Sequence, residues 1–91
     1  MLHPSTSTQF ERDKKKAQKQ KRNFKILNEV MGKLMNECPL EPKYCDHPLK
    51  GEWKGFRDCH IENDWVLIYK VEKTEKRIIF ARLGTHAELF R

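Results

Sequence analysis

The stretch Trp65-Val-Leu-Ile-Tyr-Lys-Val71 gives the strongest β-strand signal in the chain, because it is rich in β-branched and aromatic residues. Residues 56–62 before it alternate, with Arg57, Cys59 and Ile61 on one face and Phe56, Asp58, His60 and Glu62 on the other. Asn63-Asp64 between the two segments predicts a hairpin turn. We therefore expect an antiparallel sheet with residues 65–71 at its centre and His60 pointing away from the core.

The C-terminal residues predict one more strand and a short helix. A charged turn at residues 72–76 precedes Arg77-Ile-Ile-Phe-Ala-Arg-Leu83, a strand in which alternation puts Arg82 on the same side as Ile78 and Phe80. Thr85-His-Ala-Glu88 matches a capping box, in which the threonine and glutamate side chains bind free backbone N–H groups at a helix start. This helical turn would display His86, with Leu89 as its anchor.

The N-terminal half predicts two helices. Thr8-Gln-Phe-Glu11 matches a capping box and precedes a run of helix-forming residues to about Lys21. Asn23 is a candidate N-cap for a second helix, which Pro39 would end. Its expected core stripe consists of Phe24, Leu27, Met31, Leu34, Met35 and Cys38.

These elements define an α+β fold, in which two N-terminal helices pack on one side of a small antiparallel sheet. Gly32 lies inside the second helix, and we expect it to permit close packing there. Met1–Thr6 is a candidate edge strand, although His3-Pro4 weakens its β signal.

Size, charge and cysteine spacing limit the classes of function. A chain of 91 residues is expected to form one domain, residues 1–91. Its net charge of +6 favours polyanionic partners such as RNA, DNA or an acidic protein.

No apolar run reaches the roughly 18 residues of a membrane span, and the N-terminus has no signal-peptide core, so we expect a cytoplasmic protein without membrane contact. Three cysteines without Cys-x-x-Cys spacing indicate neither a disulfide framework nor a zinc site, and we expect no metal or other cofactor.

Three ordered motifs carry a resemblance to a known family. They are Tyr44-Cys-Asp-His-Pro-Leu-Lys-Gly-Glu-Trp-Lys-Gly-Phe-Arg-Asp-Cys-His60, Asp64-Trp-Val-Leu-Ile-Tyr69 and Arg82-Leu-Gly-Thr-His-Ala-Glu-Leu-Phe90. The C-terminal half thereby resembles the YafQ branch of the RelE/ParE superfamily, the ribosome-dependent mRNA endonucleases of bacterial type II toxin–antitoxin pairs. The N-terminal half is similar only in its helix pair and basic charge. The resemblance implies a RelE-like fold with the element order β-α-α-β-β-β.

The resemblance also implies roles for individual residues. The family counterparts of His47, His60, Asp64 and His86 handle protons. Those of Trp65, Arg82 and Phe90 lie close to the substrate. The implied reaction is metal-independent attack of the ribose 2′-hydroxyl on the adjacent phosphate of mRNA in the A site of the 70S ribosome. The implied partner is a cognate antitoxin, bound in a heterotetramer through an antitoxin dimer, with operator DNA contacted only by the antitoxin.

The chemistry of the residues agrees with this reaction and leaves alternatives open. Cleavage by a 2′-hydroxyl needs a base, an acid and positive charge on the phosphorane, and a histidine pair can supply both proton roles near neutral pH. The sequence does not say which histidine is base and which is acid. Asp64 is either a base, an orienting partner of a histidine or a plain turn residue. Arg82 either stabilises the phosphorane or pairs with Glu62 or Asp58.

The remaining candidates have equally ordinary alternatives. Trp65 and Phe90 either stack on bases or pack in the protein. Lys50, Lys54 and Arg57 form a basic approach whose role is phosphate contact or solubility.

Three other functions compete with the endoribonuclease hypothesis. A non-catalytic RNA-binding module needs only the charge and the aromatic residues. A ParE-like toxin directed at DNA gyrase has no need of the histidine set. A metal-dependent nuclease would use carboxylates, but Asp46, Asp58, Glu62 and Asp64 follow no fixed metal-binding motif.

Overall fold

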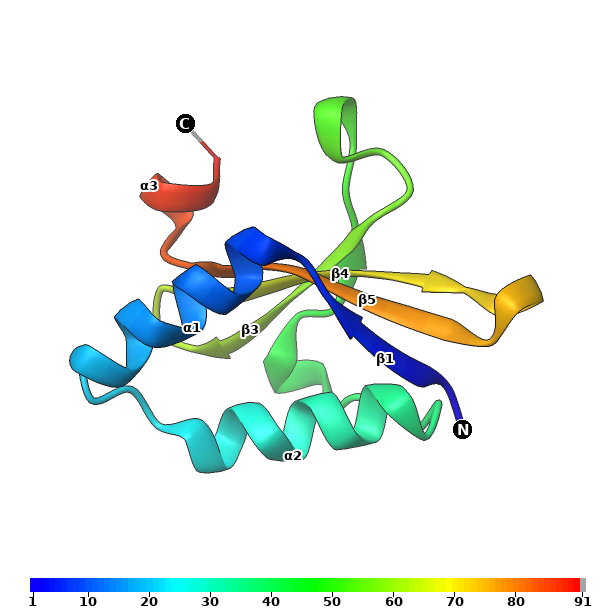
Figure 1. Cartoon of the computed structure of the whole chain (residues 1–91), viewed down its shortest axis with the longest axis horizontal. Coiled ribbons are helices and arrows are strands. Elements are labelled where there is room, and N and C mark those ends of the chain that lie inside the picture. Colours follow the sequence, from blue (N-terminus) through cyan, green and yellow to red (C-terminus); the bar gives the residue numbers. More distant parts are fainter. Residues whose placement is uncertain (91) are drawn as a thin grey trace.

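The structure is a computed structural model that describes residues 1–90 (Figure 1). Its sheet has five strands in the order β1-β5-β4-β3-β2. The strands are β1 His3–Thr6, β2 His47–Pro48, β3 Arg57–Glu62, β4 Trp65–Glu72 and β5 Arg77–Gly84. The predicted central position of residues 65–71 is confirmed, because β4 lies between β3 and β5.

The N-terminal edge strand forms despite its proline. β1 runs parallel to β5, with His3 opposite Arg77 and Thr6 opposite Phe80, whereas the other neighbouring strands are antiparallel. A proline has no N–H to donate, and an edge strand tolerates this because one of its sides is unpaired. The sheet is therefore mixed rather than purely antiparallel. The predicted α+β fold is confirmed, and the two-residue strand β2 adds one strand to the predicted order β-α-α-β-β-β.

The two long helices cover one face of the sheet. They are α1 Thr8–Lys19 and α2 Phe24–Met35. Phe10 of α1 and Leu27 of α2 share the main core with Cys59 and Ile61 of β3, so the predicted helix-facing side of that strand is confirmed. No helix among residues 1–90 is long and apolar enough to cross a membrane.

Several local details of the helices differ from the predictions. The N-cap of α1 is Ser7 rather than Thr8, since the Ser7 hydroxyl accepts a hydrogen bond from Phe10 N. Asn23 caps α2 as predicted, but the helix ends at Met35, four residues before Pro39. Cys38 is therefore exposed outside the helix. A Cβ atom on Gly32 would have no neighbour within 4 Å, so close packing does not explain this glycine.

The opposite face of the sheet carries a second, smaller core. Val66, Ile68 and Ala81 pack there with Leu89 of α3, His86–Leu89, and with residues of the loop at 49–56. Figure 1 shows this loop, in green, and α3, in red, rising from the sheet on the side away from α2. The second face is therefore bordered by two segments that the long helices do not cover.

A β-bulge in β5 reverses the predicted direction of Arg82. Tyr69 lies opposite Phe80, but Ile68 lies opposite Arg82, so Ala81 is an extra residue in the ladder. A bulge changes which face the following residues occupy. Arg82 therefore shares the face of Ile68, not that of Ile78 and Phe80 as simple alternation predicts.

Candidate active site

Three histidines from separate elements lie together on the second face. His47 is in β2, His60 is in β3, and His86 is the first residue of α3. The ring centroids of His47 and His60 are 6.4 Å apart, and those of His60 and His86 are 5.0 Å apart. The structure thus brings the three sequence-selected histidines together, with His60 in the middle.

The β3–β4 turn holds His86 through Asp64. Asp64 adopts a left-handed backbone conformation with φ of 51°, which aspartate tolerates in turns. Its Oδ1 atom accepts hydrogen bonds from the backbone N of His86 at 2.9 Å and from Nδ1 of the same residue at 2.8 Å. These bonds, the backbone one first, hold the pKa of the Asp64 carboxyl below its usual range. Asp64 is therefore an ionised partner of His86 at neutral pH.

The ring of His47 is held by a backbone carbonyl. Its Nδ1 atom lies 2.7 Å from Cys45 O and 3.0 Å from Oδ1 of Asp58. A carbonyl oxygen can only accept, so Nδ1 of His47 carries a hydrogen. The same reasoning applies to Nδ1 of His86 opposite the ionised Asp64. In both outer histidines, Nε2 is consequently the nitrogen left for another partner.

Asp58 is a buried carboxylate beside the histidines, and the sequence reasoning considered it only as a partner of Arg82 or a ligand of a metal-dependent nuclease. It is 3% exposed, and within residues 1–90 its Oδ1 accepts no well-aligned hydrogen bond. Burial raises the pKa of Asp58, and positive charge on any of the three histidines lowers it. Its position between Arg57 and Cys59 on the His60 face of the alternating strand was the signal that could have identified it.

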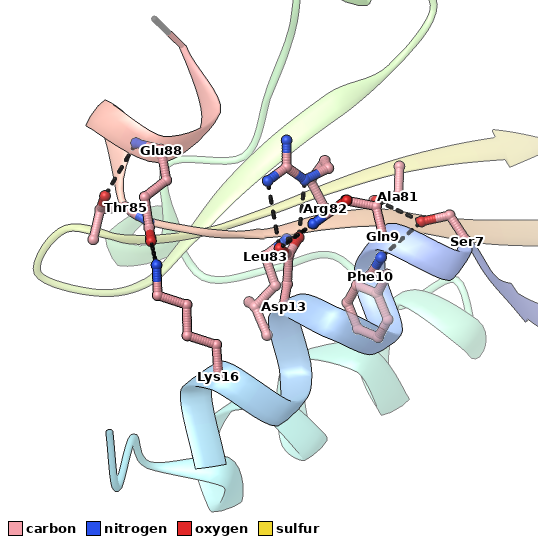
Figure 2. Close-up of polar contacts among 10 residues, drawn as sticks. All are labelled: Ser7, Gln9, Phe10, Asp13, Lys16, Ala81, Arg82, Leu83, Thr85 and Glu88. Atoms are coloured by element: carbon pink, nitrogen blue, oxygen red, sulfur yellow. Dashed lines mark hydrogen bonds and ion pairs between the residues drawn. The ribbon is translucent and has the colours of Figure 1, made fainter. Parts of the chain in front are cut away.

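Arg82 is bound by a residue that sequence reasoning did not consider. Its Nε donates to Oδ2 of Asp13 in α1 at 2.9 Å (Figure 2). The predicted alternatives for this pairing were Glu62 and Asp58. Asp13 lies 69 positions away in the sequence, so no local pattern indicates the contact.

Two of the sequence-selected residues lie away from the histidines. Trp65 is 1% exposed and packs in the main core, with its ring 5.9 Å from that of Phe24 and the Arg22 guanidinium 5.5 Å from its centroid. Of the two alternatives given for Trp65, stacking on a base or packing in the protein, this burial favours packing. Arg57 lies opposite Tyr69 on the helix-covered side and pairs with Asp46 at 3.2 Å, so its face of β3 is not the histidine face.

The other selected residues border the histidine face. Phe90 is 38% exposed, with its ring 6.1 Å from that of His86. Lys50 and Lys54 are exposed on the loop that packs against the second core. A hollow of about 380 Å³ opens beside His60 and Asp64, and Lys43 and Tyr44 also line it. The arrangement offers proton-handling groups, cations and an exposed aromatic ring on one side of the molecule.

The chain is similar to known proteins over almost its whole length. Residues 2–91 match the family described as the bacterial toxin of type II toxin–antitoxin system, YafQ. The mRNA interferase toxin YafQ of Escherichia coli strain K12 is 49% identical over 85 residues, which cover 92% of this chain and 90% of that protein.

Solved structures give the same result. A chain in the crystal structure of the Escherichia coli DinJ–YafQ complex matches with a TM-score of 0.90 and 44% identity, covering all of both chains. A metal-bound toxin from Helicobacter pylori matches with a TM-score of 0.93 and 47% identity, covering 99% of this chain and all of that one. Within residues 1–90 of the present chain, no group of three or more His, Cys, Asp or Glu side chains is placed to hold a metal ion.

Proposed function

Because the chain belongs to the YafQ family of bacterial type II toxin–antitoxin toxins, we propose that it cleaves ribosome-bound mRNA by a histidine-based, metal-independent transesterification. Its curated Escherichia coli relative is an mRNA interferase, which is an endoribonuclease. The single observation that carries the mechanism is the convergence of His47, His60 and His86 on one face of the sheet.

The two outer histidines are suited to opposite proton roles. The ionised Asp64 holds the ring of His86 through Nδ1, which fixes its orientation and leaves Nε2 for the substrate. His86 is our candidate for the general acid that protonates the departing 5′-oxygen. The closest partner of His47 Nδ1 is the neutral Cys45 carbonyl, with the buried Asp58 carboxyl at 3.0 Å, and the lone pair of the neutral ring is then on Nε2. His47 is our candidate for the base that takes the 2′-hydroxyl proton.

Positive charge and stacking complete the proposed site. Negative charge accumulates on the phosphorane during the reaction. A cation that is already in place before the reaction stabilises this charge most. Arg82 supplies this cation from β5, while His60 lies between the two proton-transfer residues. Lys50 and Lys54 approach the RNA backbone, and the exposed ring of Phe90 stacks on a base beside His86.

The proposed partners follow from the same family membership. The Escherichia coli relative is known in the DinJ–YafQ toxin–antitoxin complex. For the present chain we propose a cognate antitoxin, a heterotetramer built on an antitoxin dimer, and operator DNA contacts made only by that antitoxin. The 70S ribosome would present the mRNA in its A site, which places the protein in the cytoplasm.

The proposal is tested with purified protein, translating ribosomes and a defined mRNA. We expect cleavage only when ribosomes are present, and loss of cleavage in His47→Ala, His60→Ala and His86→Ala. Naked mRNA cut at the same rate would contradict ribosome dependence. Binding of ribosomes or RNA without any cleavage would instead favour the non-catalytic RNA-binding module.

A further inference from the structure

Helix α1 completes the edge of β5 where β1 ends. The β1–β5 ladder stops at Thr6 and Phe80. Beyond it, Ser7 Oγ donates to Ala81 O at 2.7 Å, and Asp13 Oδ2 accepts from Leu83 N at 2.9 Å (Figure 2). The side chains of Ser7, the N-cap of α1, and of Asp13, near the middle of the helix, therefore take the hydrogen-bonding positions that a longer β1 would have filled.

Asp13 is held on several sides at once. Its Oδ2 accepts from both Leu83 N and Arg82 Nε, each at 2.9 Å. Its Oδ1 accepts from Gln9 Nε2 at 3.0 Å and lies 3.4 Å from an Nη atom of Arg82. The residue is only 9% exposed, and a carboxylate buried to this extent needs such partners. Both carboxylate oxygens of Asp13 therefore have hydrogen-bond donors in the folded chain.

The same contacts fix the direction of Arg82. The bulge at Ala81 puts Arg82 in the cross-strand row of Ile68 and Asp58, on the histidine face. Asp13 binds the Nε edge of its guanidinium, and the side chain remains 24% exposed. A guanidinium has further N–H donors in a rigid planar fork, and these stay available to an oxyanion.

We propose that Asp13 is the positioning residue of Arg82, which it holds so that the remaining guanidinium N–H groups meet a phosphate oxygen of the bound RNA. The inference rests on the proposed function for the identity of that oxyanion. Asp13 touches no substrate in this account. It acts only through Arg82, by removing the rotational freedom that a long side chain would otherwise lose during the reaction.

The variant Asp13→Asn separates positioning from plain structural support. The amide oxygen of asparagine still accepts the Leu83 N–H bond, so the edge of β5 stays closed. In the place of Oδ2 this oxygen also accepts from Arg82 Nε, but the negative charge opposite the guanidinium is lost, and the amide NH₂ in the place of Oδ1 cannot accept from the Nη atom of Arg82. Alanine at position 13 would remove both functions and would not distinguish them.

Glu88 offers a matched control, because it also contacts helix α1. Its carboxylate forms an ion pair with Lys16 of α1 and completes the capping box of α3 by accepting from Thr85 N (Figure 2). Glu88→Gln removes the ion pair but keeps the capping box, because glutamine also serves at this position. It thus weakens a contact between α1 and the C-terminus without touching Arg82.

The first arm of the experiment measures kcat and KM for cleavage of ribosome-bound mRNA by the full chain. We expect Asp13→Asn to lower kcat roughly tenfold to a hundredfold, with Glu88→Gln within about twofold of the parent. In an Arg82→Gln background, Asp13→Asn should cause no further loss. An unchanged kcat in Asp13→Asn, or an equal loss in both backgrounds, would overturn the inference.

The second arm needs no RNA. In ¹⁵N NMR spectra, the Nε–H group of Arg82 should exchange slowly with water in the parent and in Glu88→Gln, and faster in Asp13→Asn, where a neutral amide oxygen replaces the carboxylate as acceptor. Fast exchange in the parent would overturn the inference even if the protein cleaves mRNA. Slow exchange in a parent that cuts no mRNA would show that Asp13 holds Arg82 while the proposed function fails.

Discussion

Asp64 Oδ1 accepts hydrogen bonds from both the backbone N and the Nδ1 atom of His86, at 2.9 and 2.8 Å. One carboxylate oxygen thus joins the β3–β4 turn to the start of α3. It fixes the backbone position and the ring orientation of His86 together. The C-terminal helix is consequently tied to the middle of the chain at the proposed general acid.

The first prediction concerns acid stability. Hydrogen bonds from His86 lower the pKa of Asp64, so the stabilising contact is fully present above the unfolded value near 4. It is lost as the pH falls through the lower folded value. Urea unfolding of the parent and Asp64→Asn should differ at pH 6, and the difference should be smaller at about pH 3, below the unfolded value. An equal difference at both pH values would contradict the contact.

The second prediction is that Asp58 changes stability with pH in the opposite direction to Asp64. Burial raises the pKa of Asp58, so the folded protein binds a proton that the unfolded chain has already released just above pH 4. The free energy of unfolding should therefore decrease as the pH rises from the unfolded pKa of Asp58 to its higher folded pKa. Asp58→Asn should lack this decrease. Urea midpoints between pH 4 and 7 check it, and parallel pH curves for the two proteins would refute it.

The third prediction separates Trp65 from Phe90. Trp65→Ala should destabilise the protein by about 3–5 kcal/mol, because it empties a fully buried site in the main core. Phe90→Ala should change stability by less than about 1 kcal/mol but reduce cleavage, since its exposed ring lies beside His86. Chemical denaturation and cleavage rates are measured on both variants. A stable Trp65→Ala protein that cuts poorly would restore Trp65 to the substrate site.

The fourth prediction uses the cysteines as reporters of the fold. Cys38 and Cys45 are exposed, whereas Cys59 is fully buried and its thiol pKa is raised by that burial. Alkylation of the native protein with iodoacetamide should therefore add two labels quickly, and the third only after unfolding. Peptide mass spectrometry assigns the sites. Rapid labelling of Cys59 in the native protein would argue against the packing of α2 on β3.

Local sequence patterns predicted most of the fold, because strand alternation and helix caps depend on residues close together in the sequence. Alternation placed Cys59 toward the helices and His60 on the other face, and the asparagine at position 23 predicted the start of α2. The direction of Arg82 could not be predicted in this way. A single extra residue in β5 reverses its face, and nothing in the sequence around Ala81 indicates the bulge.

The candidate site was predicted in part for the same reason. The histidines stood out because histidine can serve as acid or base in RNA cleavage, and the family resemblance implied that they act in one site. The family resemblance implied that Trp65 lies near the substrate, and the sequence left packing open as the alternative because a tryptophan at the start of a strand looks the same in a core and on a surface. Asp13 was missed because its partners lie 69 and 70 positions away, and only the folded chain brings them together.

The central claim is that the ribose 2′-hydroxyl of the mRNA is the nucleophile and that histidines move the protons. The most direct measurement replaces the nucleotide at the cleaved position by its 2′-deoxy analogue in an mRNA programmed on translating ribosomes. The account predicts that the unmodified mRNA yields a 2′,3′-cyclic phosphate or 3′-phosphate and a 5′-hydroxyl, and that the substituted mRNA stays intact. Cleavage of the deoxy-substituted mRNA at the same position, or a 5′-phosphate on the product, would contradict it.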